Sequence, residues 1–244
     1  MRRLTLAMGM LVTSMGLVLA PLAHAESDKA KAAHKVHVAA EVLKEIMDTP
    51  DKGIPRDLLS QAAAVAIFPD VIKAGFVIGG KYGRGVILRH EPSTNRWSAP
   101  AFYSIGAGSV GWQIGAESTD LVLVIRHQRG VESLLHNELT LGGDASVAAG
   151  PVGRSAQAGT DVALKSEVLS YSRSRGLFAG ISLEGAKINQ LNDYNRAYYG
   201  RKLTSREILI EHKVSPPASA RELIRELERY SRPLPRKKHS HHKH

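Results

Sequence analysis

Residues 97–126 have the sequence WSAPAFYSIGAGSVGWQIGAESTDLVLVIR, which holds both tryptophans of the chain and several closely spaced glycines. The apolar run at 121–125 has the composition of a fully buried strand. Over 110–117, apolar residues alternate with glycine and polar residues, and a period of two predicts a strand and not a helix. The stretch therefore predicts the middle of a β-rich core.

Glycine is concentrated in the same part of the chain, because 18 of the 22 glycines lie between Gly75 and Gly185. Glycine weakens a strand, so this density indicates bulges, sharp bends or the close approach of another backbone or a ligand. Residues 73–90 share the composition and predict one long bent strand or a hairpin. We therefore expect an α+β fold, in which a bent, glycine-rich, mainly antiparallel β-sheet or barrel-like core is flanked by α-helices.

Two helices are predicted before the sheet. Apolar residues spaced i, i+3 and i+4 predict an amphipathic helix over 27–48, capped by Ser27 or Asp28. Its apolar stripe is rich in alanine, which favours packing on its own domain over a position on a membrane surface. Pro55 predicts the first turn of a second helix, which ends near Val65.

Three short helices are predicted in the second half of the chain. Residues 130–138 have the apolar pattern of one of them. Capping boxes at 204–207 and 219–222 predict the starts of two more, of which the second runs to Tyr230.

Two glycine motifs resemble nucleotide-binding or phosphate-binding loops in sequence. Gly106, Gly108 and Gly111 spell G-x-G-x-x-G, but such a fingerprint must open a helix, and the residues that follow alternate like a strand. Glycines for sheet curvature explain the motif better. Residues 79–85 carry two bases among glycines and either present N–H groups and charge to a phosphate or form a tight turn.

The chain shows no set of residues that predicts catalysis. It has no G-x-S-x-G elbow and no H-E-x-x-H motif, and nothing in the sequence brings a serine, a histidine and an aspartate together. The absence of cysteine excludes disulfides, thiol catalysis and cysteine-based metal sites. We expect no enzymatic activity, no cofactor and no metal site, with an unrecognised hydrolase as the third alternative.

The N-terminus has the pattern of an export signal. Residues 1–25 combine a charged start, an apolar stretch and the cleavage site Ala23-His24-Ala25, with an uncleaved anchor as the alternative. We expect an exported, periplasmic protein, peripheral on an envelope membrane. The domains predicted are the signal peptide 1–25, an amphipathic helix 26–50, a domain 51–216 and a basic, His-rich tail 217–244.

The formal net charge of +10 is unevenly distributed, since the tail carries +5 and the signal +2. The remaining +3 on the body argues against nucleic acid as a partner. The tail either contacts an anionic membrane surface or keeps the protein in solution. Its histidines at 239, 241, 242 and 244 either bind a metal ion weakly or belong to a solvated tail.

From about residue 54 to 211 the chain resembles the SYLF lipid-binding domain, which is also described as the yeast-type actin-binding domain. The matching blocks occur in the family's order: IPRDLLSQAAAVAIFPDVIKAGFVIGGKYGRGV, WSAPAFYSIGAGSVGWQIGAESTDLVLVI, LTLGGDASVAAGPVGR, YSRSRGLFAGISLEGA and NRAYYG. The resemblance implies a binding module that is not an enzyme. Eukaryotic members bind membranes that contain phosphoinositide, and some bind actin filaments.

The resemblance implies recognition of anionic phospholipid as the function in a bacterial envelope. The alternative is a periplasmic protein-interaction or structural module with a protein partner. The matched basic residues predicted to contact a lipid headgroup are Lys73, Lys81, Arg84, Arg173 and Arg175.

Overall fold

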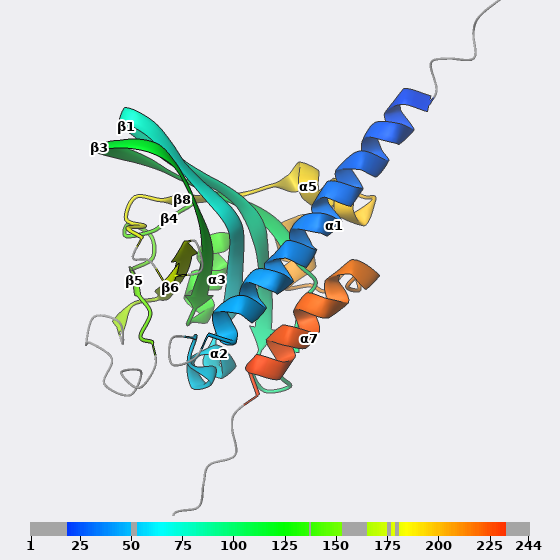
Figure 1. Ribbon diagram of the computed structural model, residues 1–244. Coiled ribbons are helices and arrows are strands. Elements are labelled where there is room, and N and C mark those ends of the chain that lie inside the picture. Colours follow the sequence, from blue (N-terminus) through cyan, green and yellow to red (C-terminus); the bar gives the residue numbers. More distant parts are fainter. Residues whose placement is uncertain are drawn as a thin grey trace, which may run out of the picture.

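The computed structural model describes residues 19–49, 53–136, 138–152, 165–174, 177–178 and 181–232. Helices flank a single curled sheet in which two strands are much longer than the others (Figure 1). The elements are α1 (Leu19–Met47), α2 (Arg56–Gln61), β1 (Ala64–Glu91), β2 (Arg96–Trp97), β3 (Ala101–Ile125), α3 (Gln128–Leu134), β4 (Glu138–Thr140), β5 (Val147–Ala149), β6 (Val168–Ser174), β7 (Leu177–Phe178), β8 (Lys187–Gln190), α5 (Asn192–Tyr199), α6 (Ser205–Leu209), a 3₁₀ turn (Ala218–Ala220) and α7 (Arg221–Tyr230).

β1 and β3 form an antiparallel ladder that runs from Ala64 opposite Ile125 to Ile87 opposite Ala101. Both halves of β1 therefore pair with β3, so one long bent strand is confirmed and the hairpin alternative is wrong. The ladder continues through β6 to β5, while β8 joins the other half of β3. Among the described strand pairs only β5 and β6 are parallel, and the mainly antiparallel α+β fold is confirmed.

Glycine allows the ribbon formed by β1 and β3 to curl onto itself. A Cβ atom on Gly85 would lie 2.0 Å from the carbonyl oxygen of Ile67, and one on Gly83 would lie 2.8 Å from a methyl carbon of Val71. Each glycine thus meets a residue of the other half of its own strand. The close backbone approach predicted from the glycine density is confirmed here.

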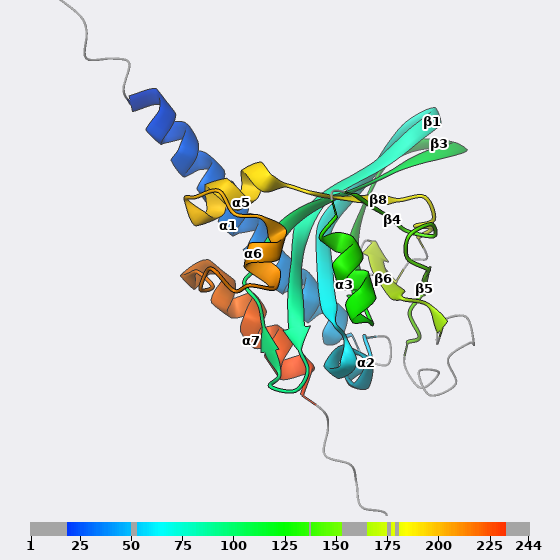
Figure 2. The same ribbon diagram turned by 180° about the vertical axis from the view of Figure 1, so that it is seen from behind.

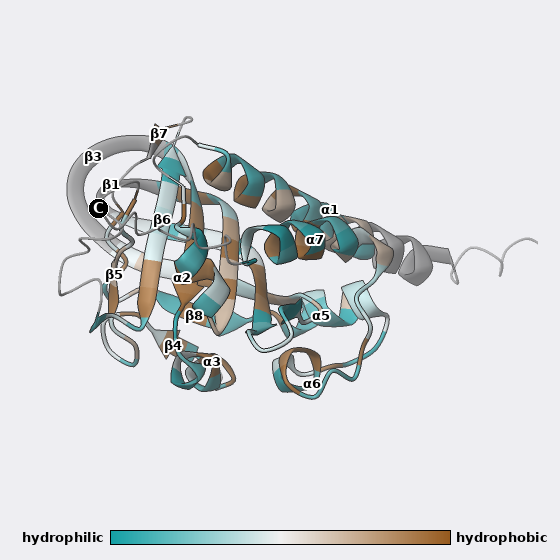
Figure 3. Ribbon diagram, turned by 90° about the horizontal axis from the view of Figure 1, so that it is seen from below, coloured by the Kyte–Doolittle hydropathy of each residue, from teal (hydrophilic) through white to brown (hydrophobic). Residues whose placement is uncertain are grey.

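The curled sheet has an inner and an outer face, each with its own core. Phe68, Leu121 and Leu123 lie on the inner face and pack with α3 and α6. Val122 and Val124 lie on the outer face and pack with α1 and α7. Figure 2 shows α3 and α6 in front of the sheet, and Figure 3 shows α1 and α7 side by side on the opposite side from them.

The apolar stripe of α1 is buried by the sheet and by neighbouring helices. Ala32, Val36, Leu43 and Ile46 are completely buried, which confirms that this stripe packs on its own domain. The helix begins at Leu19, so the prediction that Ser27 or Asp28 caps it is wrong. None of the helices within the described residues is both long and apolar enough to cross a membrane.

α7 belongs to the same core as α1. Leu223 and Leu227 are fully buried, and Tyr230 donates a hydrogen bond of 2.7 Å to Asp48 Oδ1 at the end of α1. Three parts of the chain that the sequence analysis treats as separate therefore pack together where the structure describes them: 26–50, 51–216 and 217–244.

Trp97 connects the end of α7 to the sheet through a hydrogen bond and a ring stack. Its ring is almost fully buried and stacks on His90 with 4.3 Å between ring centroids. Its Nε1 donates to Ser231 Oγ at 3.2 Å, and Ser231 directly follows α7. The first tryptophan of the stretch that predicts the core thus joins β2 to the last helix.

Several helix boundaries differ from the prediction. α2 ends at Gln61, because Ala64 and Val65 already pair with β3. α3 ends at Leu134 instead of reaching residue 138, where β4 begins.

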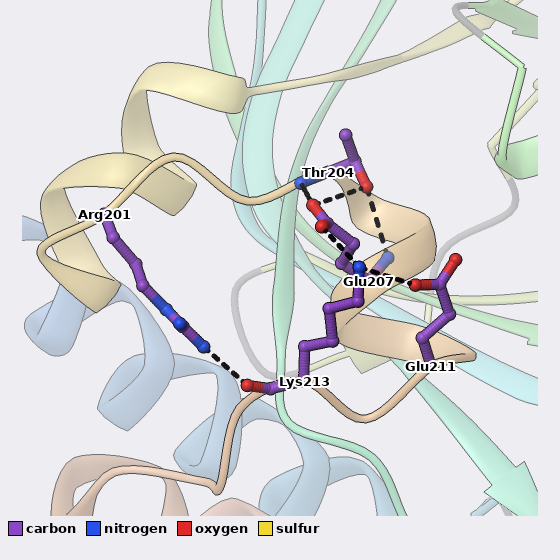
Figure 4. A network of polar contacts seen from close by, with 5 residues as sticks. All are labelled: Arg201, Thr204, Glu207, Glu211 and Lys213. Atoms are coloured by element: carbon purple, nitrogen blue, oxygen red, sulfur yellow. Dashed lines mark hydrogen bonds and ion pairs between the residues drawn. The ribbon is translucent and has the colours of Figure 1, made fainter.

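Of the two predicted capping boxes, only the first exists. Thr204 and Glu207 cap α6 reciprocally, and Lys213 reaches back to the same carboxylate (Figure 4). Ala220 occupies the N-cap position of α7 without a side-chain bond, because Ser219 lies in the 3₁₀ turn and contacts the Tyr198 hydroxyl instead.

Candidate functional site

A cavity of about 250 Å³ lies on the inner face, where the two halves of β1 separate. Lys73 from the first half and Lys81 from the second half both line it. Glu117 of β3, which lies directly opposite Lys73 in the ladder, is the third charged residue of the wall. Val71, Thr119, Ile181 and Ser182 complete the cavity.

The alternation of side chains along β1 and the position of Gly83 together explain why a cavity forms here. Lys73 shares a face with Val71, and Lys81 shares a face with Gly83, because alternate residues of a strand point to the same side. Gly83 holds the two halves of the ribbon in contact beside Val71. Two residues farther along each half, at Lys73 and Lys81, the longer side chains line open space instead of backbone.

The electrostatics place the three charges in one cluster. Burial lowers the pKa of Lys81, and the positive charge of Lys73 lowers it further, while the negative charge of Glu117 acts in the opposite direction. Lys81 Nζ donates to the backbone oxygen of Ser182 at 3.0 Å. An ammonium carries three donors, so this bond fixes the side chain and leaves donors for a ligand.

Glu117 is also held in place. Ser174 Oγ lies 3.1 Å from Glu117 Oε1 and 3.1 Å from the backbone oxygen of Ser118, which ties the carboxylate to β6. The cavity therefore presents two ammonium groups and one positioned carboxylate. This arrangement can bind an anion through its lysines and can accept a hydrogen bond from the same ligand.

Arg84 lies on the other face of the sheet. Its Nη1 donates to the Tyr194 hydroxyl at 2.8 Å and its Nε to the Tyr82 hydroxyl at 3.0 Å. The guanidinium also lies over both rings, 5.5 Å from the centroid of Tyr82 and 5.4 Å from that of Tyr194. The hydrogen bond that Arg84 donates to the Tyr82 hydroxyl is the main cause of a raised Arg84 pKa. Arg84 thus connects β1 to α5 and does not reach the cavity.

Arg173 is also on the outer face, where it forms an ion pair with Glu45 of α1. Its side chain is only 18% exposed. Arg175 lies outside the described residues. Of the five basic residues predicted to contact a headgroup, the structure brings Lys73 and Lys81 together and places Arg84 and Arg173 elsewhere.

Glu117 and Ser182 were not predicted from the sequence. Strand alternation places Glu117 on the same face as Gly115. It could not show that Lys73 lies opposite, because that follows from the pairing of two strands. Ser182 enters through a loop that follows β7, and no motif marks it.

The other chemical alternatives find no support in the geometry. Gly106, Gly108 and Gly111 lie within β3, so sheet curvature and not a helix-opening loop accounts for the G-x-G-x-x-G motif. Within the part of the chain that the structure describes, no three histidines or carboxylates gather as metal ligands. The histidines of the tail lie outside the described residues.

Curated proteins of similar sequence occur in vertebrates and yeast. "SH3 domain-containing YSC84-like protein 1" of Xenopus laevis is 39% identical over 202 residues, which covers 79% of this chain and 59% of that protein. The protein of the same name from Homo sapiens is 35% identical over 199 residues, with 79% and 57% covered. "LAS seventeen-binding protein 3" of Saccharomyces cerevisiae strain S288c is 40% identical over 182 residues, with 73% and 39% covered.

The chain spans less than two thirds of the length of these relatives. The profile of the Ysc84 family, described as "Las17-binding protein actin regulator", matches residues 106–230. This match covers half of the chain and includes most of β3, the cavity residue Glu117 and the helices from α3 to α7. The chain therefore belongs to the Ysc84 family, whose domain is the SYLF domain that the sequence blocks resemble.

Proposed function

We propose that this protein binds anionic phospholipid at an envelope membrane, without turnover, through the cavity between the halves of β1. The observation that carries the proposal is the convergence of Lys73 and Lys81 on one cavity. Burial and then the positive charge of Lys73 lower the pKa of Lys81, and an anionic ligand between the two lysines would offset their repulsion. A phosphate group supplies the charge and the acceptor oxygens that two ammonium groups require.

The proposed location rests on the sequence pattern of residues 1–25, which is that of an export signal. The anionic surface is then the outer leaflet of the inner membrane or the inner leaflet of the outer membrane. A basic residue close to an anionic membrane contributes about 1 kcal/mol at low ionic strength. Two lysines in one cavity therefore account for about 2 kcal/mol of the binding free energy.

Co-sedimentation with vesicles of neutral or anionic phospholipid tests the proposal. We expect the protein to sediment only with anionic vesicles and to be released by salt. The double variant Lys73→Gln, Lys81→Gln should bind about 30-fold more weakly, which corresponds to about 2 kcal/mol. The matched control is Lys29→Gln, Lys202→Gln, which removes two exposed lysines that do not line the cavity. Equal binding by the two double variants would contradict the role of the cavity.

The basic C-terminal tail needs its own comparison, because a tail alone can tether a protein to an anionic surface. The shortened variant should end at Arg232, since an end at Pro216 would remove the buried residues Leu223 and Leu227. Binding by this variant would assign lipid recognition to the folded domain. Binding by the full chain alone would assign it to the tail.

The second candidate function is protein binding, which the names of the relatives favour. The yeast relative is named as a binding protein for LAS seventeen, and the family description calls its members actin regulators. A periplasmic protein-interaction module would capture one protein in the absence of lipid and at high salt. Such capture, together with a failure to sediment with anionic vesicles, would favour this second function.

A further inference from the structure

The cavity contains a carboxylate as well as two lysines, and this mixture restricts its ligand. Lys73 and Glu117 are direct partners in an antiparallel ladder, where Cβ atoms on one face lie about 5 Å apart. Glu117 also acts on the charge of Lys81 from across the cavity. The wall thus carries two positive charges and one negative charge, within contact of the same ligand.

The position of Glu117 is built into the fold. Ser174 reaches its carboxylate from β6, at 3.1 Å. An ionised carboxylate only accepts hydrogen bonds and repels other anions at short range. A ligand that fills the cavity must therefore offer a donor to Glu117 and keep its negative charge near the lysines.

We propose that Glu117 determines specificity, so that the cavity takes a phosphodiester headgroup with a hydroxyl or ammonium donor and disfavours a phosphomonoester. This inference rests on the proposed function. A phosphodiester carries one negative charge, whereas a phosphomonoester carries about −1.5 to −2 at pH 7 because its second pKa is near 6. The additional charge would lie beside Glu117.

The size of the cavity agrees with a headgroup as its occupant. A volume of about 250 Å³ equals the share of about eight liquid waters at ~30 Å³ each. This is space for a phosphate and a small alcohol, with the acyl chains outside. Ile181 in the cavity wall and Leu177, whose exposed fraction is 72%, offer apolar contacts on the same side of the sheet.

Vesicles that contain phosphatidylglycerol or phosphatidic acid in neutral phosphatidylcholine, matched for surface charge, separate the two phosphate types. We expect the protein to bind phosphatidylglycerol about three- to fivefold more tightly, the size of one ion-pair interaction at a partly exposed site. Glu117→Gln keeps the acceptor oxygen for Ser174 but removes the charge. It should strengthen binding to phosphatidic acid and bring the ratio close to one.

The control variant is Glu132→Gln, on the exposed side of α3, which should keep the native ratio. If Glu117→Gln strengthens binding to both lipids equally, the carboxylate adds only general charge and the specificity proposal is overturned, while lipid binding stands. If the native protein sediments with neither vesicle, the proposed function itself fails.

Soluble headgroups distinguish a lipid from a free phosphate. Calorimetry with glycerophosphoglycerol and glycerol 3-phosphate should show the same preference for the diester, with weaker affinity than for vesicles. Binding of the soluble diester without any binding to vesicles would identify the ligand as a free phosphodiester and overturn the lipid source. Equal binding of both soluble compounds would overturn the selectivity of Glu117.

Discussion

At the scale of single residues, Gly85 is a position where a side chain would collide with backbone. The carbonyl oxygen of Ile67 occupies the space that a Cβ atom on Gly85 would need. This oxygen belongs to the backbone, so it cannot move aside as a flexible side chain could. The contact lies in the inner core, between the two halves of one strand. The curvature that opens the cavity at Lys73 and Lys81 therefore depends on this glycine.

Gly85→Ala should destabilise the protein by about 3 kcal/mol or more, because the added methyl must displace backbone in a packed core. The change is measured as the free energy of unfolding in urea. Gly108→Ala is the matched control, since a Cβ there meets no atom within 4 Å. If both variants lose the same stability, close packing of the ribbon is not what Gly85 provides.

Glu207 contributes stability that depends on pH. The Thr204 backbone N–H and then the Lys213 ammonium stabilise its ionised form and lower its pKa from 4.5 to about 2. Because the pKa is lower in the folded state, this stability is present above about pH 4.5 and is lost as the pH falls toward 2. Figure 4 shows the groups that surround the carboxylate.

Glu207→Gln should therefore lower the melting temperature at pH 7 and make it less sensitive to pH between 4.5 and 2. Thermal unfolding followed by circular dichroism across this range tests the prediction. Glu132→Gln controls for the loss of one negative charge on the surface. A slope that is unchanged in Glu207→Gln would show that another group governs the acid transition.

At the scale of elements, the outer face of the sheet is held to the helices by polar contacts at its edges. The pair of Arg173 and Glu45 joins β6 to the end of α1. The bond from Arg84 to Tyr194 joins β1 to α5. These two arginines thus support the helices that cover the outer core, whatever their role at a membrane.

A double-mutant cycle on Arg173→Ala and Glu45→Ala should give a coupling energy of about 0.5–1 kcal/mol, as expected for a partly exposed ion pair. The free energy of unfolding of the four proteins is measured at low salt. Repeating the cycle at high salt should reduce the coupling. A coupling near zero in both conditions would mean that the pair does not hold α1 to β6.

At the scale of the whole molecule, two separated parts of the chain form one layer. α1 and α7 lie side by side over the sheet (Figure 3), and the leucines of α7 fill the space between them. A protein without α7 would expose the stripe of α1 that now packs against Leu223 and Leu227. The folded unit therefore extends at least to Ser231.

Ending the chain at Arg232 should leave the melting temperature almost unchanged, whereas Leu227→Ala should destabilise the protein by about 2–5 kcal/mol. The second value is the usual loss for a leucine in a closed core, and Leu227 is completely buried. Arg225→Ala, on the surface of the same helix, is the control. A small effect of Leu227→Ala would contradict the packing of α7 in the core.

Local sequence patterns are sufficient for much of this molecule. The period of two over 110–117 and the apolar run at 121–125 indicate β3, because side-chain alternation follows directly from strand geometry. The apolar stripe on 27–48 indicates a packed helix, because residues spaced i, i+3 and i+4 lie on one face of an α-helix. The capping box at Thr204 is also local. Helix ends were less well predicted, since strand pairing already includes Ala64 and Val65.

Which charged side chains share a site is decided only by the tertiary structure. In the sequence, Lys81 lies nearer to Arg84 than to Lys73, yet Lys73 and Lys81 share the cavity while Arg84 is on the opposite face. The register shifts at 68–71 and 75–77 and the contact of Gly83 with Val71 set how far the ribbon bends. A strand pattern states the face on which a side chain lies, but the distance across a curled sheet depends on backbone contacts between residues far apart in the chain.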